Sequence, residues 1–178
     1  MTSARAPFRY RGPARLAIHR LKFSGWRDVA AAIAEAIAAS PGGLPPVDVV
    51  TWVPLARRRL AERGYDQARA LAVALGRRLD VPAAALVRRT VATGPQAARS
   101  GADRRSAMEG AFVPRRSAPP RVLLVDDVLT TGATVAACAT ALRAAGAREV
   151  HVAAAARASG GARGAAALRP PTVRAYPG

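Results

Sequence analysis

The chain has 178 residues and a formal net charge of +17, from 28 Lys and Arg against 11 Asp and Glu. This length allows one domain with a substantial core, and a hydrophobic content of 51% argues against a disordered chain. The one cysteine, Cys138, excludes a disulfide framework or a Cys-rich zinc site within the chain, as expected in the reducing cytoplasm. The opening residues MTSARAPFRY lack the apolar core of a secretory signal, and the Ala-rich stretch from Val29 to Ala39 is too short to span a bilayer.

The positive charge has two explanations, which the sequence alone leaves open. A field of this sign attracts nucleic acid, membrane surfaces or phosphorylated ligands. A chain rich in Arg and Ala, in which Lys22 is the only lysine, is also what a GC-rich genome tends to encode. The distribution favours a functional role, because the segment from Arg57 to Arg121 holds 15 Arg against 5 Asp and Glu and so carries +10 of the +17.

Apolar periodicity and the positions of Gly and Pro predict alternating helices and strands. In chain order, the expected elements are two short helices within 16–39, a loop at 40–46, a strand at 47–53, a loop leading into a helix at 66–79, a short strand at 86–91, a long loop at 93–112, a strand at 121–125, a helix at 133–147, a strand at 149–156 and an irregular tail from 158. This alternation predicts an α/β fold with a mostly parallel central sheet flanked by helices. We expect an N-terminal helical segment at 1–46, a core at 47–157 and a C-terminal tail at 158–178.

The most informative stretch is VLLVDDVLTTGAT at 122–134, where an apolar strand runs directly into Asp126 and Asp127. Two acids at the end of a buried strand are costly unless they bind something. The turn that follows offers a glycine, three threonine hydroxyls and the N–H groups of a helix start, which together suit one phosphate. Carboxylates accept hydrogen bonds from sugar hydroxyls and also hold Mg²⁺, directly or through water. The stretch therefore predicts a phosphosugar site at the carboxyl edge of the sheet.

This stretch resembles the phosphoribosyl-pyrophosphate (PRPP) loop of the type I phosphoribosyltransferases, and no Walker-type Gly-Lys-Ser/Thr occurs in the chain. The resemblance implies a type I phosphoribosyltransferase fold. It implies that Asp126 and Asp127, as the catalytic acid pair, hold the ribose hydroxyls and Mg²⁺. It also implies that the 5′-phosphate is bound by the turn Thr130, Thr131, Gly132, Ala133 and Thr134.

A longer similarity, over residues 10 to 157, resembles the ComF/GntX-type proteins. It is carried, in this order, by YRGPARLAIHRLKFSG, VPLARRRLAERGYDQA, PQAARSGADRRSAMEGAF and the PRPP loop. Such proteins are linked to DNA uptake in competence and, for GntX, to sugar-acid use. The chain departs from the pattern in three ways: it has no Cys-rich zinc-binding module, and Asp66 and Ala107 stand where Asn is common. The missing module indicates a short form or a late start site.

Two basic segments are expected to meet the pyrophosphate of PRPP. The resemblance implies that the loop Pro54, Leu55, Ala56 and Arg57 faces it, and the alternative is a solvated basic turn. A flexible hood at about 92–118 is expected to close over the reacting ribose and exclude water, with arginines that bind pyrophosphate bidentately. The alternative for the hood is a disordered basic loop. Its candidate residues are Gln96, Arg99, Arg104 and Arg105.

A third motif, RGYDQ, resembles the RGxNQ motif of the same family and implies a role in the pocket. Its residues are Arg63, Gly64, Tyr65, Asp66 and Gln67. Asp66 is also suited to cap the following helix, and capping alone explains part of the pattern.

For the remaining His, Cys, Trp and Tyr residues, the sequence pattern favours structural roles. His19 and His151 lack metal-ligand spacing, and His151 is expected to face the opposite side of its strand from Val150 and Val152. Cys138 lies among alanines in a predicted helix and is expected in the core. No Ser-His-Asp or Cys-His arrangement is evident. Trp26 and Tyr65 are suited either to stacking bases or to packing in the core or at its rim.

Three functions remain open from the sequence. The first is a ComF-like cytoplasmic protein that binds PRPP or a related phosphosugar with Mg²⁺ and handles incoming single-stranded DNA beside a helicase-like partner. The second is a non-catalytic module that senses PRPP and binds single-stranded DNA. The third is nucleobase salvage. Thr130 argues against salvage of 6-oxopurines, because an acid commonly stands there in those relatives and a hydroxyl does not ionise near neutral pH.

Overall fold

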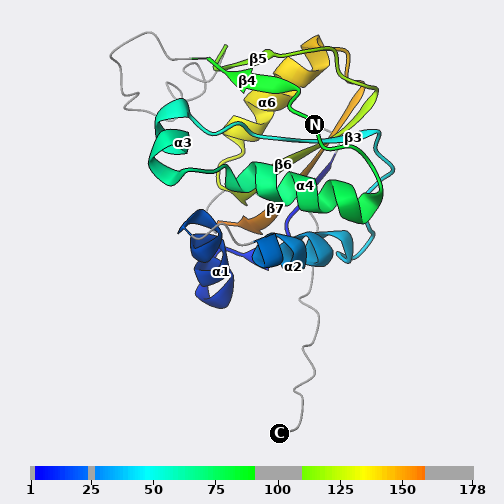
Figure 1. Cartoon of the computed structure of the whole chain (residues 1–178). Helices are drawn as coiled ribbons and strands as arrows, with labels where there is room; N and C mark the ends of the chain where they lie inside the picture. Colours follow the sequence, from blue (N-terminus) through cyan, green and yellow to red (C-terminus); the bar gives the residue numbers. More distant parts are fainter. Residues whose placement is uncertain (1–2, 24–26, 91–109, 159–178) are drawn as a thin grey trace, which may run out of the picture.

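A parallel sheet forms the centre of the fold (Figure 1). The computed structural model describes residues 3–23, 27–90 and 110–158. Within them the strands lie in the order β1-β7-β6-β3, β2 also pairs with β7, and every pair of this sheet is parallel. The predicted α/β architecture is confirmed. The strands are β1 Ser3–Arg5, β2 Phe8–Arg9, β3 Val49–Trp52, β6 Arg121–Leu129 and β7 Glu149–Arg157.

Helices cover both faces of this sheet. Successive side chains of β6 point to opposite faces of the sheet. Leu123 and Val125 belong to the buried cluster on one face, and Val122 and Leu124 belong to the cluster on the other. Figure 1 shows α2 and α4 on one side of the sheet and α6 on the other. Because both faces are buried, β6 begins as the unbroken apolar run that the sequence displays. The helices of this central unit are α1 Gly12–Phe23, α2 Arg27–Ala38, α4 Gln67–Leu79 and α6 Ala133–Ala144. Among the described helices, none has the length and apolar character needed to cross a lipid bilayer.

A second, two-stranded sheet lies over α6. Strands β4 (Val87–Arg89) and β5 (Phe112–Pro114) pair antiparallel, and Val87 and Phe112 are buried in the cluster that contains α6. Phe112, predicted as the last residue of a long loop at 93–112, is therefore the first residue of strand β5. Most of the predicted hood, including Gln96, Arg99, Arg104 and Arg105, lies outside the described residues.

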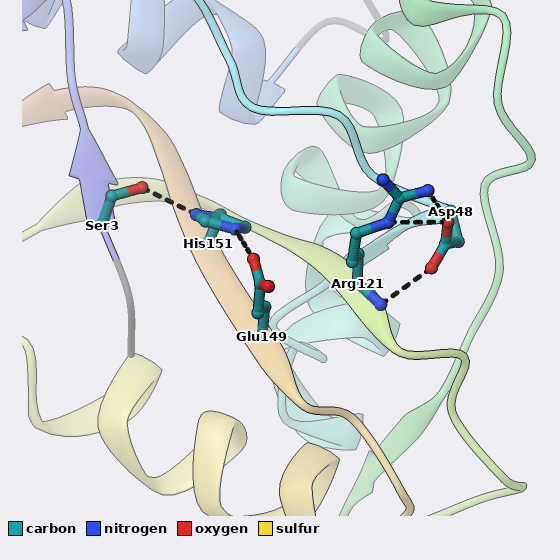
Figure 2. Close-up of polar contacts among 5 residues, drawn as sticks. All are labelled: Ser3, Asp48, Arg121, Glu149 and His151. Carbon is teal, nitrogen blue, oxygen red and sulfur yellow. Dashed lines mark hydrogen bonds and ion pairs between the residues drawn. The ribbon is translucent and has the colours of Figure 1, made fainter.

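The N-terminal residues complete one edge of the central sheet, so the predicted N-terminal helical segment at 1–46 also contributes the short strands β1 and β2. Ser3 lies beside His151, and Ser3 Oγ is 2.9 Å from His151 Nδ1 (Figure 2). On the other side of the imidazole, Nε2 is 3.1 Å from Glu149 Oε2. Arg121, at the start of β6, forms an ion pair with Asp48. These contacts hold together the amino ends of β1, β3, β6 and β7, at the opposite end of the sheet from the carboxyl edge.

Two further differences from the prediction bear on the candidate site. Residues 57–63, expected as part of a loop, form helix α3 (Arg57–Arg63), which ends at Gly64 in a left-handed conformation with φ of 75°. The strand expected at 121–125 continues to Leu129, because β7 pairs with it beyond Asp126. The helix expected at 66–79 is confirmed over Gln67–Leu79, with Asp66 as its N-cap.

Candidate functional site

A cleft of about 350 Å³ lies at the carboxyl ends of β3 and β6. This is where ligands bind in parallel α/β sheets. It brings together three carboxylates and three arginines from segments that are far apart in the chain. The residues lining it are Tyr10, Val53, Pro54, Leu55, Arg59, Arg63, Asp66, Gln67, Ala68, Arg89, Asp126, Asp127, Val128, Thr130, Thr134 and Ala158.

Asp126 and Asp127, which follow the apolar run of β6, form one wall of the cleft. Each accepts a 2.8 Å hydrogen bond from the next backbone N–H: Asp126 Oδ1 from Asp127, and Asp127 Oδ1 from Val128. Both residues are half-buried. Burial and the charge of Asp127 raise the pKa of Asp126 well above its usual value. Asp126 is therefore a carboxylate whose charged form is disfavoured by its surroundings, as is common at functional sites.

The predicted phosphate turn connects β6 to α6. Thr130 and Thr134 line the cleft, while Thr131, Gly132 and Ala133 form the turn between them. Gly132 has a φ of 81°, a left-handed conformation that favours glycine. Thr131 Oγ1 accepts a hydrogen bond from the Ala133 N–H at 3.4 Å. The backbone N–H groups at the start of α6 thus lie beside two cleft-lining hydroxyls, an arrangement suited to an anion.

The predicted pyrophosphate loop is only partly placed in the cleft. Pro54 and Leu55 line it, but the Leu55 N–H already donates to Asp66 Oδ2 at 3.2 Å. Ala56 precedes α3, and Arg57 begins that helix as an exposed residue that is not among the cleft-lining set. The positive wall comes instead from other arginines, which are Arg59 and Arg63 on α3 and Arg89 on β4.

The RGYDQ motif joins this loop to the acid pair. Asp66 caps α4 by accepting from the Arg69 N–H at 3.1 Å, and its other oxygen holds Leu55. Burial raises the pKa of Asp66, although the backbone donors oppose that shift. Gln67, the next residue, donates from Nε2 to Asp127 Oδ2 at 3.2 Å. A pocket position is therefore observed for Arg63, Asp66 and Gln67, while Gly64 and Tyr65 form the connecting turn.

Sequence comparison identifies the family to which the chain belongs. A family model described as the phosphoribosyl transferase domain matches residues 66–169, more than half of the chain. The chain belongs to the phosphoribosyl transferase domain family. The type I phosphoribosyltransferase fold predicted from the PRPP-loop resemblance is thereby confirmed.

Curated relatives of this phosphoribosyl transferase domain protein have names connected with DNA. The chain is 36% identical over 153 residues to DNA utilization protein YhgH of Escherichia coli O157:H7, covering 80% of this chain and 66% of that protein. It is 39% identical over 110 residues to Competence protein F of Haemophilus influenzae, covering 59% of this chain and 48% of that protein. The chain therefore spans about two thirds or less of the length of these relatives.

A solved structure with a similar fold is the glutamine PRPP amidotransferase of Bacillus subtilis in complex with ADP and GMP. It is 25% identical, with a TM-score of 0.48, and the match covers 72% of this chain and 25% of that one.

Within this phosphoribosyl transferase domain, the sequence did not indicate several cleft residues. Arg59 lies on one face of α3 with Arg63, four residues later, which the RGYDQ motif had already indicated, so a correct helix prediction there would have paired the two. Arg89 also lies over the Phe112 ring, with its guanidinium carbon 5.4 Å from the ring centroid. Tyr10 reaches the cleft because β2 pairs with β7, and no local pattern signals that pairing.

The polar groups outside the cleft have structural positions in this phosphoribosyl transferase domain. Cys138 is fully buried, and burial raises the pKa of its thiol, as expected for a core residue. The sequence showed no Ser-His-acid arrangement, yet Ser3, His151 and Glu149 lie together. They lie at the opposite end of β7 from the cleft, and His151 is buried. Trp26 lies outside the described residues.

Replacing Asp66 by Ala is expected to destabilise this phosphoribosyl transferase domain by about 1 kcal/mol, because α4 loses its cap and Leu55 loses its acceptor. For a chain of this size, the melting temperature should fall by about 2–4 °C. Asp66→Asn is the comparison: it keeps the oxygen that caps α4 but turns its NH₂ toward the Leu55 N–H, so its loss of stability should be intermediate. Thermal unfolding followed by circular dichroism measures the melting temperature of both variants. An Asn variant as unstable as the Ala variant would contradict this role of the acceptor oxygen.

Proposed function

We propose that this chain binds PRPP or a closely related phosphosugar together with Mg²⁺. The observation that carries the proposal is the placement of a half-buried acid pair beside a Thr/Gly turn within one cleft. Asp126 and Asp127 accept hydrogen bonds from the ribose hydroxyls. The turn from Thr130 to Thr134 binds the 5′-phosphate with its N–H and hydroxyl groups.

The pyrophosphate of PRPP then faces the positive wall. Arg59, Arg63 and Arg89 line the cleft together with Pro54 and Leu55, and guanidinium groups bind phosphate oxygens bidentately. Ala56 and Arg57 continue this loop, and the hood residues Gln96, Arg99, Arg104 and Arg105 are proposed to close over the ligand. If an acceptor displaces pyrophosphate, the protein contributes positioning and charge stabilisation.

The donor set fits Mg²⁺ that arrives with its ligand. Asp126 and Asp127 provide the oxygen atoms that Mg²⁺ prefers. Within residues 3–23, 27–90 and 110–158, no group of three or more His, Cys, Asp or Glu side chains is arranged to hold a metal ion. Mg²⁺ commonly combines one or two carboxylates with substrate phosphates, so the acid pair would hold it jointly with PRPP.

In the cell, the proposed role is the handling of incoming DNA in the cytoplasm. The support is the similarity to proteins named for DNA utilization and competence, together with the net charge of +17. Single-stranded DNA is the proposed polyanion, and a helicase-like competence protein is the proposed partner. A PRPP-sensing module without turnover would use the same cleft and the same basic surface.

Salvage of 6-oxopurines is the less favoured alternative. Thr130 lines the cleft, and its hydroxyl does not assist proton transfer at a ring nitrogen as a carboxylate does. A pyrophosphate-release assay with hypoxanthine and guanine separates the alternatives. Turnover on the order of 1 s⁻¹ would make salvage the leading function.

Ligand-induced stabilisation tests the proposed binding function. PRPP at about 100 times its Kd is expected to stabilise the protein by about 2.7 kcal/mol, which appears as a raised melting temperature. Mg²⁺ alone and glucose 6-phosphate, whose sugar lacks the ribose geometry, are the comparison ligands. An equal rise with glucose 6-phosphate and with PRPP would show a general anion effect and contradict the proposal.

A further inference from the structure

Gln67 has an arrangement that the proposed contacts do not explain. It is the first residue of α4, its side chain lines the cleft, and the residue is only 4% exposed. Its amide nitrogen donates to Asp127 Oδ2 at 3.2 Å, although the two residues are 60 positions apart. This contact links the RGYDQ turn to the carboxylate that is proposed to bind ribose.

The pairing with a carboxylate determines which way the amide is turned. A carboxylate only accepts, so the nitrogen of the amide must face Asp127 and the oxygen must face away from it. That oxygen, Oε1, is buried and has no hydrogen-bond partner among the described residues. An unpaired buried acceptor destabilises a fold, so its presence at a cleft requires an explanation.

The neighbouring residue strengthens this interpretation. The Tyr65 hydroxyl is also buried without a hydrogen-bond partner among the described residues, and burial raises the pKa of that phenol. Tyr65 and Gln67, two positions apart in the chain, therefore each carry a buried polar atom without a partner among the described residues. Asp66, between them, has both carboxylate oxygens engaged by backbone N–H groups and does not supply a donor.

We propose that Gln67 is a ligand-binding residue, which orients Asp127 through its amide nitrogen and, when its side chain turns to expose the buried Oε1, accepts a hydrogen bond from a sugar hydroxyl. This inference rests on the proposed function, because it assigns a contact within the same phosphosugar site. A hydroxyl is the matching group: it donates to Oε1 and accepts from other donors, whereas a phosphate oxygen has no proton to donate near neutral pH. Gln67 then adds a contact to the sugar beside the one that Asp127 makes.

A double-mutant cycle between protein and ligand tests this contact. Calorimetry measures the Kd of ribose 5-phosphate, 2-deoxyribose 5-phosphate and 3-deoxyribose 5-phosphate for the wild type and for Gln67→Met, which has similar volume and no hydrogen-bonding amide. The wild type is expected to prefer ribose 5-phosphate over at least one deoxy sugar by about fivefold. In Gln67→Met this preference should fall to about twofold, because the acid pair still binds the ribose hydroxyls. Asp80→Asn, at the other end of α4, is the control and should keep the wild-type preference.

The outcomes distinguish this inference from the function on which it rests. If the wild type binds ribose 5-phosphate and Gln67→Met keeps the full preference, the Gln67 contact is wrong and the phosphosugar site stands. If the wild type binds all three sugars equally, the Gln67 contact and the proposed contacts of the acid pair to the ribose hydroxyls are both wrong. If the wild type binds neither ribose 5-phosphate nor PRPP, both fall. If Gln67→Met does not fold, Gln67→Asn withdraws the amide by one methylene and is judged by the same criterion.

Discussion

Asp126→Asn is expected to stabilise the ligand-free protein at neutral pH while it weakens phosphosugar binding by about 10- to 150-fold. The loss of binding corresponds to one charge-assisted hydrogen bond of about 1.5–3 kcal/mol. The gain in stability follows from the burial of Asp126 and the nearby charge of Asp127, which raise its pKa in the folded state. Residues that lower the stability of the fold but are needed for ligand binding are common at functional sites.

The pH dependence of this effect has a definite sign. When the pKa of an acid is higher in the folded than in the unfolded state, the unfolded state binds fewer protons and stability decreases as pH rises. The penalty of Asp126 is absent below the unfolded pKa of about 3.9 and is complete above the raised folded pKa. Asp126→Asn removes the ionisation, so the difference in melting temperature between variant and wild type should shrink as pH falls toward about 4.

Calorimetric binding and thermal unfolding at several pH values measure the two effects. Asp80→Asn is the matched control, because Asp80 is exposed and adopts a left-handed φ of 55° that asparagine tolerates. A destabilised Asp126→Asn protein at neutral pH would contradict the charge argument. Unchanged binding of PRPP would contradict the assignment of the acid pair.

Replacing Arg57, Arg58 and Arg59 by Gln is expected to flatten the salt dependence of single-stranded DNA binding. These residues are consecutive and exposed at the start of α3, next to the cleft. For single strands, the slope of log K against log salt is about −0.7 for each phosphate neutralised, so the loss of three contacts should reduce it by about 2. Fluorescence anisotropy with a labelled oligonucleotide over a range of salt concentrations measures the slope.

The control for this surface carries the same change of charge elsewhere. Arg77, Arg143 and Arg148 are exposed and do not line the cleft. Their replacement by Gln should leave most of the slope intact. Equal effects of the two triple variants would show that the whole positive field, rather than α3, attracts DNA. No binding at low salt would leave genome composition as the explanation of the charge.

The central strands and the phosphosugar turn are predictable because their signals are local. β3, β6 and β7 read as apolar or β-branched runs, and Asp126, Asp127 and the Thr/Gly turn follow within nine residues of chain. Strands β1 and β2 carry no such signal. They are two or three residues long and exist through their pairing with β7 about 150 positions away, which is tertiary context.

Helix α3 was missed for a different reason. RRRLAER has no apolar face, and its one large apolar residue, Leu60, is exposed. The remaining signals were weaker: good helix formers, an Arg58–Glu62 pair four residues apart and Gly64 as the stop. The link from Gln67 to Asp127 spans 60 positions, so only the folded chain brings these side chains together.

Calorimetric titration of the wild-type chain with PRPP, in the presence and absence of Mg²⁺, tests whether this cleft is a phosphosugar site. We expect saturable binding with one site per chain, weakened by removal of Mg²⁺ and by Asp126→Asn with Asp127→Asn, which together remove contacts of about 1.5–3 kcal/mol each. Binding of PRPP that is equally tight in wild type and double variant would contradict the assignment, as would no binding at millimolar PRPP and Mg²⁺.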